Sequence, residues 1–461
     1  MKTAFTPTLQ LNTDLWTRIV AFDLDQPLSE YGFSTRLAHE NCWTQAFTAT
    51  AILEYKKFMY LAATTDFMVS PSEIVDTVWH QHLIFTQSYT EFCGLLGRTI
   101  QHIPSTHNRD DYERFRQAKE RTAELYARTF GEQPKAIWDY AGMFEGLALP
   151  KASRNIRTFV IAGILAFLVL TLPAYFLLRP LYVRIGNPTF ILSYLALIAL
   201  TFTGLEIYNR RYLNRLVKGF NSFAFVYHLR PLELVYLKTQ SVANVVHGIM
   251  HQLLTTNQLV INPDNTLEEK SIDPPRTVEE FTVLETMRQL GATPYPVLLN
   301  QLVQKPVFSN VANSLDAFKK YLIKSERFGR LFYLNFGVLS LLLMLSVIRM
   351  ATGLLRDKPV TQIFLLLLVV VVMMTVFLSR LTKLLCTHTI PARYTSELLP
   401  KQQNADAWEW RYFSDGTAVL TPSLIPLVSN PNKSGDTSDS SSSSGDSGCG
   451  SGGSCGGCGG D

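Results

Sequence analysis

The side chains with the clearest chemical potential lie in the segment VDTVWHQH, which carries Asp76, Trp79, His80 and His82. Five of the nine histidines precede residue 110, and His102 is among them. Imidazole nitrogens and carboxylate oxygens are common ligands of zinc and related metal ions. The sequence therefore predicts a metal site with His80, His82 and His102 as candidate ligands. Asp76 and Trp79 are further positions of the same motif.

The spacing of the two central histidines leaves alternatives open. Residues two apart on a continuous helix do not share a face. His80 and His82 therefore bind one ion only if the helix ends between them or if one of them points elsewhere. The structural alternative is a pair of buried, hydrogen-bonded histidines with Trp79 in the core, and a third option is His80 as a general base. No serine or cysteine lies in a recognisable nucleophile motif, so we predict no catalytic residue.

A second group of potential ligands lies in the last residues of the chain. Cys455 and Cys458 have C-x-x-C spacing, and Cys449 precedes Cys455 by six residues. Thiolates at such spacing ligate zinc or another soft metal, and exposed thiols are also sites of oxidation or lipidation. The surrounding residues 431–461 are rich in Ser and Gly and have almost no apolar surface to bury, so we predict a disordered tail. The alternative is a flexible tail with incidental thiols.

The N-terminal 150 residues must position the histidine motif, and their pattern predicts a helical soluble domain. Apolar residues recur at helical spacing over residues 44–63. Ser70, Pro71 and Glu73 together predict a capped helix start just before the motif. A later helix is expected to begin near Asp110 and to end at Gly131.

Four segments of this region resemble a known family. FSTRLAHENCW, EYKKFMYLA, PSEIVDTVWHQHLIFTQSYTEFC and LGRTIQHIPS, starting at residues 33, 54, 71 and 96, are similar to the N-terminal domain of glycine-rich domain-containing proteins. The resemblance spans roughly residues 14–140, with WHxH at its core. It implies a compact helical domain and no established catalytic residues. The rest of the chain resembles, in organisation, uncharacterised bacterial multi-span membrane proteins with a Gly/Cys-rich tail.

Four long apolar runs dominate the remaining sequence. They cover residues 158–178, 188–205, 331–348 and 360–379. Runs of about 20 apolar residues match the length that a helix needs to cross a hydrocarbon core of roughly 30 Å. The composition agrees, because only 17% of residues are charged, against about 25% in soluble proteins. We therefore predict two transmembrane hairpins, over residues 158–206 and 331–379.

The positions of charged residues relative to these runs disfavour one class of function and predict the orientation of the chain in the membrane. No ionisable residue lies in the middle of a span, which disfavours a transporter or channel. Basic residues cluster before the first span, between the hairpins and after the fourth span. By the positive-inside rule, both termini and the central domain are expected in the cytoplasm of a multi-pass protein of the bacterial plasma (inner) membrane.

The region between the hairpins, residues 212–330, is predicted to form a small soluble domain. Apolar residues form a helical stripe over 242–254, a strand candidate covers 258–262, and Pro263-Asp264-Asn265 predicts a turn. This order is typical of a winged-helix-like unit. Residues 231–275 hold two basic and five acidic side chains, so a nucleic-acid partner is disfavoured. Beyond the second hairpin, residues 387–430 are predicted to hold a β-hairpin with its turn at Asp415-Gly416.

These observations predict a mainly α protein with a helical N-terminal domain, four transmembrane helices, a small winged-helix-like central domain and a disordered tail. The leading functional hypothesis is a non-enzymatic scaffold or interaction protein in contact with the lipid bilayer and with protein partners. The alternative is a membrane-anchored metal-binding protein or metalloenzyme that uses the WHQH histidines, the tail cysteines or both with a zinc-like ion.

Overall fold

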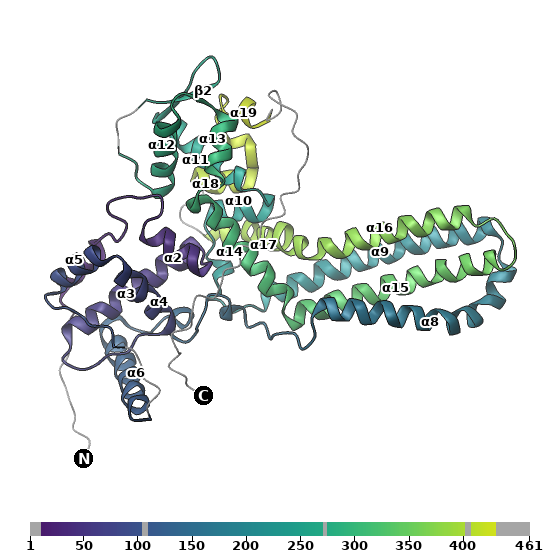
Figure 1. The fold of residues 1–461 in the computed structure, drawn as a ribbon, viewed down its shortest axis with the longest axis horizontal. Helices are drawn as coiled ribbons and strands as arrows, with labels where there is room; N and C mark the ends of the chain where they lie inside the picture. Colours follow the sequence, from purple (N-terminus) through teal and green to yellow (C-terminus); the bar gives the residue numbers. More distant parts are fainter. Residues whose placement is uncertain (1–10, 104–108, 271–273, 402–406, 430–461) are drawn as a thin grey trace. The chain divides into compact units, whose positions relative to one another are not determined.

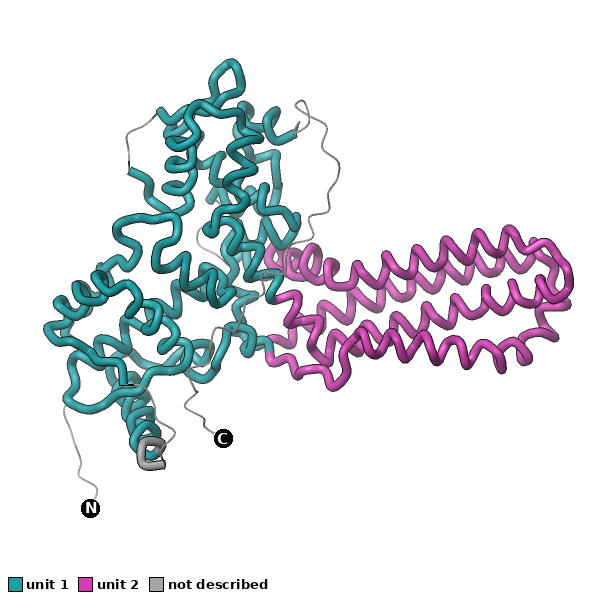
Figure 2. Tube along the Cα trace, viewed as in Figure 1, with its two compact units in different colours: residues 1–147, 221–317, 397–461 teal, residues 148–220, 318–396 magenta. Residues whose placement is uncertain are grey.

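The computed structural model describes residues 11–103, 109–270, 274–401 and 407–429, and most of them are helical (Figure 1). The chain divides into two compact units (Figure 2). Unit 1 combines residues 1–147, 221–317 and 397–461, and unit 2 combines residues 148–220 and 318–396. The predicted N-terminal and central domains thus share one unit, which the apolar hairpins of unit 2 interrupt twice in the sequence.

The N-terminal part of unit 1 is a set of short helices around a central one. Its elements are α1 (Thr13–Ala21), α2 (Phe33–Asn41), α3 (Gln45–Thr64), α4 (Glu73–Ile84), α5 (Thr86–Leu96), α6 (Arg109–Phe130), α7 (Lys135–Trp138) and the 3-10 turn η1 (Glu145–Leu147). Helix α3 packs against α1, α2, α4, α6 and α7. Most of its apolar residues, among them Tyr55, Phe58, Met59 and Leu61, are buried.

The start of α4 differs from the prediction. The hydroxyl of Ser72, rather than that of Ser70, accepts the hydrogen bond from the backbone N–H of Val75, at 3.2 Å. Ser70 instead donates its own backbone N–H to the Thr122 hydroxyl of α6. The predicted stop of α6 is confirmed, because Gly131 follows it with a φ of 87°, a conformation that glycine adopts without strain.

The central segment of unit 1 contains the predicted helices, strand and turn. Its elements are η2 (Phe225–Tyr227), α10 (Pro231–Thr239), α11 (Val242–Thr255), β1 (Leu259–Ile261), β2 (Thr266–Glu269), α12 (Val278–Leu290), β3 (Thr293–Pro294), α13 (Tyr295–Leu302) and α14 (Pro306–Ile323), whose last residues, from Phe318, belong to unit 2. The strands form an antiparallel sheet in the order β1-β2-β3. The expected stripe of α11 is buried, as Val246, Met250 and Leu253 show.

The first and central segments of unit 1 meet at the start of α3. Gln45 donates its backbone N–H to Glu233 at 2.8 Å and its side-chain amide to Glu279 at 2.6 Å. The Asn310 amide donates to the backbone carbonyl of Trp43 at 3.2 Å. Burial raises the pKa of the Glu233 carboxyl. These polar contacts join helices that are far apart in the sequence.

The predicted β-hairpin after the second apolar pair was wrong. Residues 408–419 form the helix α18 (Trp408–Asp415) and the 3-10 turn η6 (Gly416–Val419), and α19 (Ile425–Ser429) follows. A helix buries Trp410 and Phe413 together, and the Tyr412 hydroxyl donates to the Asn244 carbonyl of α11 at 2.8 Å. Gly416, with a φ of 67°, ends this helix instead of turning a hairpin.

Unit 2 contains four helices that are long and apolar enough to cross a membrane. They are α8 (Ile156–Arg184), α9 (Asn187–Lys218), α15 (Glu326–Leu354) and α16 (Thr361–Leu384). The last continues through η3 (Leu385–Thr389), α17 (Ile390–Arg393), η4 (Tyr394–Leu398) and η5 (Leu399–Lys401). Helix α15 packs on the other three helices. In its most apolar 18-residue stretch 44% of the residues are buried, whereas none is buried in the corresponding stretch of α8. This is the architecture expected of a multi-pass membrane protein.

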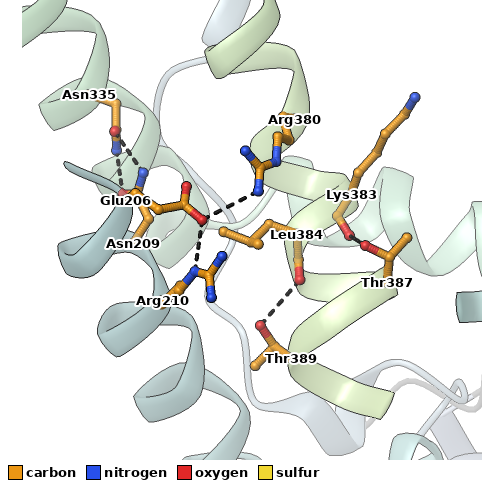
Figure 3. Close-up of polar contacts among 9 residues, drawn as sticks. All are labelled: Glu206, Asn209, Arg210, Asn335, Arg380, Lys383, Leu384, Thr387 and Thr389. Carbon is orange, nitrogen blue, oxygen red and sulfur yellow. Dashed lines mark hydrogen bonds and ion pairs between the residues drawn. The ribbon is translucent and has the colours of Figure 1, made fainter. Parts of the chain in front are cut away.

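A pair of amides fixes the register between α9 and α15. Asn209 donates to the Asn335 amide oxygen at 2.9 Å, and Asn335 donates back to Asn209 at 2.8 Å (Figure 3). Both side chains are fully buried. Buried polar groups in an apolar bundle need partners, and displacement of either helix by one turn would break both hydrogen bonds between the two amides.

Arg349 lies inside α15, although the third span was predicted to end at residue 348. It is buried, and its guanidinium donates to the backbone carbonyls of Tyr182 and Ile185, the latter at 2.9 Å. It also donates to the Asn187 amide oxygen at 2.7 Å and lies 5.0 Å from the centre of the Phe190 ring. The guanidinium therefore holds the connection between α8 and α9 against α15.

Replacing Arg349 with alanine is expected to destabilise unit 2 by about 2 kcal/mol, because hydrogen bonds between membrane helices contribute roughly 0.6 kcal/mol each and three are lost. The measurement is the loss of helical circular dichroism when the detergent-solubilised chain is titrated with sodium dodecyl sulfate. Arg184→Ala is the matched control, since Arg184 is exposed. Equal effects of the two substitutions would contradict the anchoring role of Arg349.

Candidate metal site

Three potential metal ligands converge at the surface of unit 1. Asp76 and His80 lie on α4, one turn apart and therefore on one face, and His102 lies in the segment after α5. The His102 Nε2 is 3.0 Å from one Asp76 carboxylate oxygen, and the His80 Nε2 is 3.9 Å from the other. The candidate ligand atoms of all three residues lie within 4.8 Å of one another.

The segment that carries His102 is held by aromatic contacts. The Trp79 ring lies 4.6 Å from the His102 ring, centre to centre. The Trp79 indole N–H donates to the Tyr89 hydroxyl at 3.1 Å, and that hydroxyl donates to the Ile100 carbonyl. Tyr89 belongs to α5, so it links α4, α5 and the His102 segment. Trp79 thus acts as a core residue that supports one face of a candidate ligand.

His82 is not part of this cluster. Helix α4 continues past it, so His82 points to another face and is fully buried. Its Nδ1 is hydrogen-bonded to the Tyr55 hydroxyl at 2.8 Å and its Nε2 to the Ser88 hydroxyl at 3.1 Å. Burial lowers the pKa of His82 to about 4. Both ring nitrogens are therefore occupied by the protein itself.

The cluster is open to solvent and chemically suited to a metal ion. The side chains of Asp76 and His80 are 34% and 38% exposed, and that of His102 is 19% exposed. Zinc binds His nitrogen and carboxylate oxygen at about 2.0–2.2 Å, which places tetrahedral ligand atoms about 3.3–3.6 Å apart. The recorded separations of 3.0 Å between Asp76 and His102 and 3.9 Å between Asp76 and His80 are close to that spacing. Two histidines and one carboxylate would leave at least one coordination position for water or another ligand.

The structure changes the ligand set that the sequence suggested. It brings together His80 and His102 and adds Asp76, which the motif analysis did not place among the ligands. The signal was available, because Asp76 and His80 are four residues apart on a helix. The tail residues Cys449, Cys455 and Cys458 lie outside the described residues.

One comparison with known proteins bears on this site. Residues 32–122 match a protein-family model described as UCP032817-like. The match covers α2 to α5 and much of α6, and it includes all three residues of the cluster. No curated protein and no solved structure shows a significant match to the chain.

Proposed function

We propose that this chain is a membrane-anchored metal-binding protein whose metal site is Asp76, His80 and His102. The observation that carries the proposal is the convergence of three ligand atoms within 4.8 Å. Helical spacing supports it, since Asp76 and His80 share a face, and so does the aromatic contact that holds His102 in place. A zinc-like ion fits this nitrogen and oxygen donor set.

The proposal stops at binding and assigns no reaction. Among the described residues, the recorded side-chain contacts of Asp76, His80 and His102 include no serine, cysteine or lysine nucleophile. The protein would therefore present a bound ion, or a surface shaped by that ion, to a partner. The scaffold or interaction role predicted from the sequence is compatible with this function, and it is the function that remains if no metal binds.

We also propose the orientation of the soluble unit. Unit 1 combines segments before, between and after the two apolar hairpins, which supports placing all three segments on one side of the bilayer. Basic residues flank the hairpins on that side, among them Arg157, Arg211 and Lys383. The positive-inside rule then favours the cytoplasmic face of the bacterial inner membrane. The proposed likeness to glycine-rich domain-containing proteins concerns residues 14–140 of this unit.

The test is metal analysis of the full chain, purified in detergent and equilibrated with zinc. We expect about one zinc ion per chain, and its loss in His80→Ala/His102→Ala, because one remaining carboxylate is too weak a ligand set. His39→Ala is the matched control, since His39 contacts Tyr31 and is outside the cluster. A chain truncated after Asn430 should keep its zinc. Zinc that is lost with the tail would assign binding to the cysteines, and a zinc-free wild-type chain would refute the metal proposal.

A further inference from the structure

One end of unit 2 carries most of its charged residues. The first turn of α8, the last turns of α9 and α16 and the first turn of α15 meet there. The Tyr212 hydroxyl of α9 donates to the Arg327 carbonyl, and the Tyr333 hydroxyl of α15 donates to the Arg154 carbonyl. The acidic residues of unit 2 are Glu206, Glu326 and Asp357, against 20 lysines and arginines. This end therefore has a strong excess of positive charge.

Two arginines at this end are held side by side by one carboxylate. The Arg210 Nε donates to the Glu206 Oε1 at 2.7 Å, and the Arg380 Nη2 approaches the same oxygen at 3.3 Å (Figure 3). Arg210 and Glu206 belong to α9, and Arg380 belongs to α16. One negative charge faces two positive charges, so the group keeps a net charge of about +1 at neutral pH. The cluster is called the Arg210–Arg380 pair below.

The remaining donors of this pair are available to a ligand. The side chains of Arg210 and Arg380 are 61% and 47% exposed, whereas Glu206 is 23% exposed. A guanidinium has five N–H donors, and each of these two uses a single nitrogen on Glu206. Among the described residues, no other acceptor is recorded for either guanidinium. Glu206 thus positions the two groups without using up their hydrogen-bonding capacity.

The position of the pair along the helices is fixed. Asn209, the neighbour of Arg210, makes the reciprocal amide pair with Asn335 of α15. Arg380 lies one residue after the predicted end of the fourth span, and Lys383 is exposed one turn further along α16. The guanidiniums therefore lie where the apolar surface of α9 and α16 gives way to charged residues, which is the depth of lipid headgroups in a bilayer.

We propose that the Arg210–Arg380 pair binds the phosphate of an anionic phospholipid headgroup. Guanidinium groups bind phosphate oxygens with paired N–H donors, and two preorganised groups offer such donors from two sides. The apolar side chains next to the pair would accommodate the acyl chains of the same lipid. A free phosphate lacks those chains and would gain only the polar contacts. The lipid is therefore the occupant that uses both parts of the surface.

The experiment uses the full chain, delipidated in a nonionic detergent and titrated with phosphatidylglycerol in mixed micelles. Lipid retained by the protein is counted by native mass spectrometry, and inorganic phosphate is added in a parallel series. Arg210→Gln/Arg380→Gln is the test variant. Arg179→Gln/Arg184→Gln is the matched control, because it removes the same charge from two exposed arginines of unit 2 at the other end of α8. Circular dichroism establishes that each variant keeps its helices.

We expect phosphatidylglycerol to bind the wild-type chain and the control with equal affinity, and the test variant to bind about tenfold more weakly, the loss of roughly 1.4 kcal/mol. Arg210→Lys/Arg380→Lys keeps the positive charges but removes the planar, paired N–H donors of the guanidinium groups. It should bind phosphatidylglycerol with intermediate affinity. Equal losses of affinity for phosphatidylglycerol in the test and control variants would show that only the net charge matters, and would overturn the proposed site. Equal competition by inorganic phosphate would overturn the assignment to a lipid, and undiminished binding by the test variant would overturn the proposal.

Discussion

Glu54→Ala is expected to lower the free energy of unfolding of unit 1 by about 3–5 kcal/mol, the range found when one partner of a buried ionic network is removed. Glu54 is buried in α3. Its carboxylate accepts from the Tyr126 hydroxyl, the Trp138 indole N–H and the Lys57 ammonium group, each at 2.7 Å. These donors come from α6, α7 and α3, so one carboxylate joins three helices. Its removal leaves the Tyr126 hydroxyl and the Trp138 indole N–H without this acceptor, and Lys57 without its opposite charge.

Tryptophan fluorescence during urea unfolding measures this change in the full chain. All six tryptophans, at positions 16, 43, 79, 138, 408 and 410, belong to unit 1, so their emission reports that unit even while detergent maintains the apolar helices. Glu91→Ala is the matched control, because Glu91 is exposed on α5, and we expect it to change stability by no more than about 0.5 kcal/mol. A loss below about 1 kcal/mol in Glu54→Ala would show that the network contributes little.

Acid is expected to destabilise unit 1 between pH 6.5 and pH 4 through its buried histidines. Burial lowers the pKa of His82 and of His247 to about 4, from an ordinary value of 6.5. The folded chain therefore binds fewer protons than the unfolded chain in this interval, so stability is complete above pH 6.5 and falls as the pH decreases. Each histidine contributes about 3 kcal/mol to the loss at pH 4. Burial shifts the pKa of His251 in the same direction.

The two histidines can be separated by substitution. His82 has two hydrogen-bond partners, whereas neither ring nitrogen of His247 has one among the described residues. His247→Leu should therefore preserve stability at pH 7.5 and remove close to half of the acid-induced loss, measured as the urea midpoint of tryptophan fluorescence from pH 4.5 to 7.5. His228→Leu replaces an exposed histidine and should leave the profile unchanged. An unaltered profile in His247→Leu would contradict a role for this group.

Much of the fold is predictable because it rests on local pattern. Three of the four apolar runs fall inside α8, α9 and α15, and the fourth begins one residue before α16, since an unbroken apolar stretch has few alternatives to a spanning helix. The stripe of α11 is equally clear. Local pattern fails at α18, where Asp415-Gly416 fits a hairpin turn as well as a helix end. There the burial of Trp410 and Phe413 against distant helices decides the structure.

The candidate site was only partly predictable for a related reason. Helical periodicity separates His80 from His82, but it does not say which of them faces the core. The answer depends on Tyr55 and Ser88, which come from other helices and take both nitrogens of His82. His102 lies near Asp76 and His80 because the segment after α5 packs against α4. That packing depends on contacts of Trp79 and Tyr89, which are not visible in the sequence pattern.

The three-segment construction of unit 1 has a consequence for how the protein is made. Gln45 and its partner Glu233 are separated by 188 residues, and α18 is synthesised later still. At about 5–20 residues per second, the ribosome needs roughly 10–40 s to bridge the first gap. During that time the first apolar hairpin, α8 and α9, is expected to enter the bilayer. The N-terminal helices still lack the central segment of unit 1 that packs against them in the folded chain. Synthesis thus couples the folding of these helices to the insertion of the hairpins that follow, and an insertion defect is expected to appear first as degradation of unit 1.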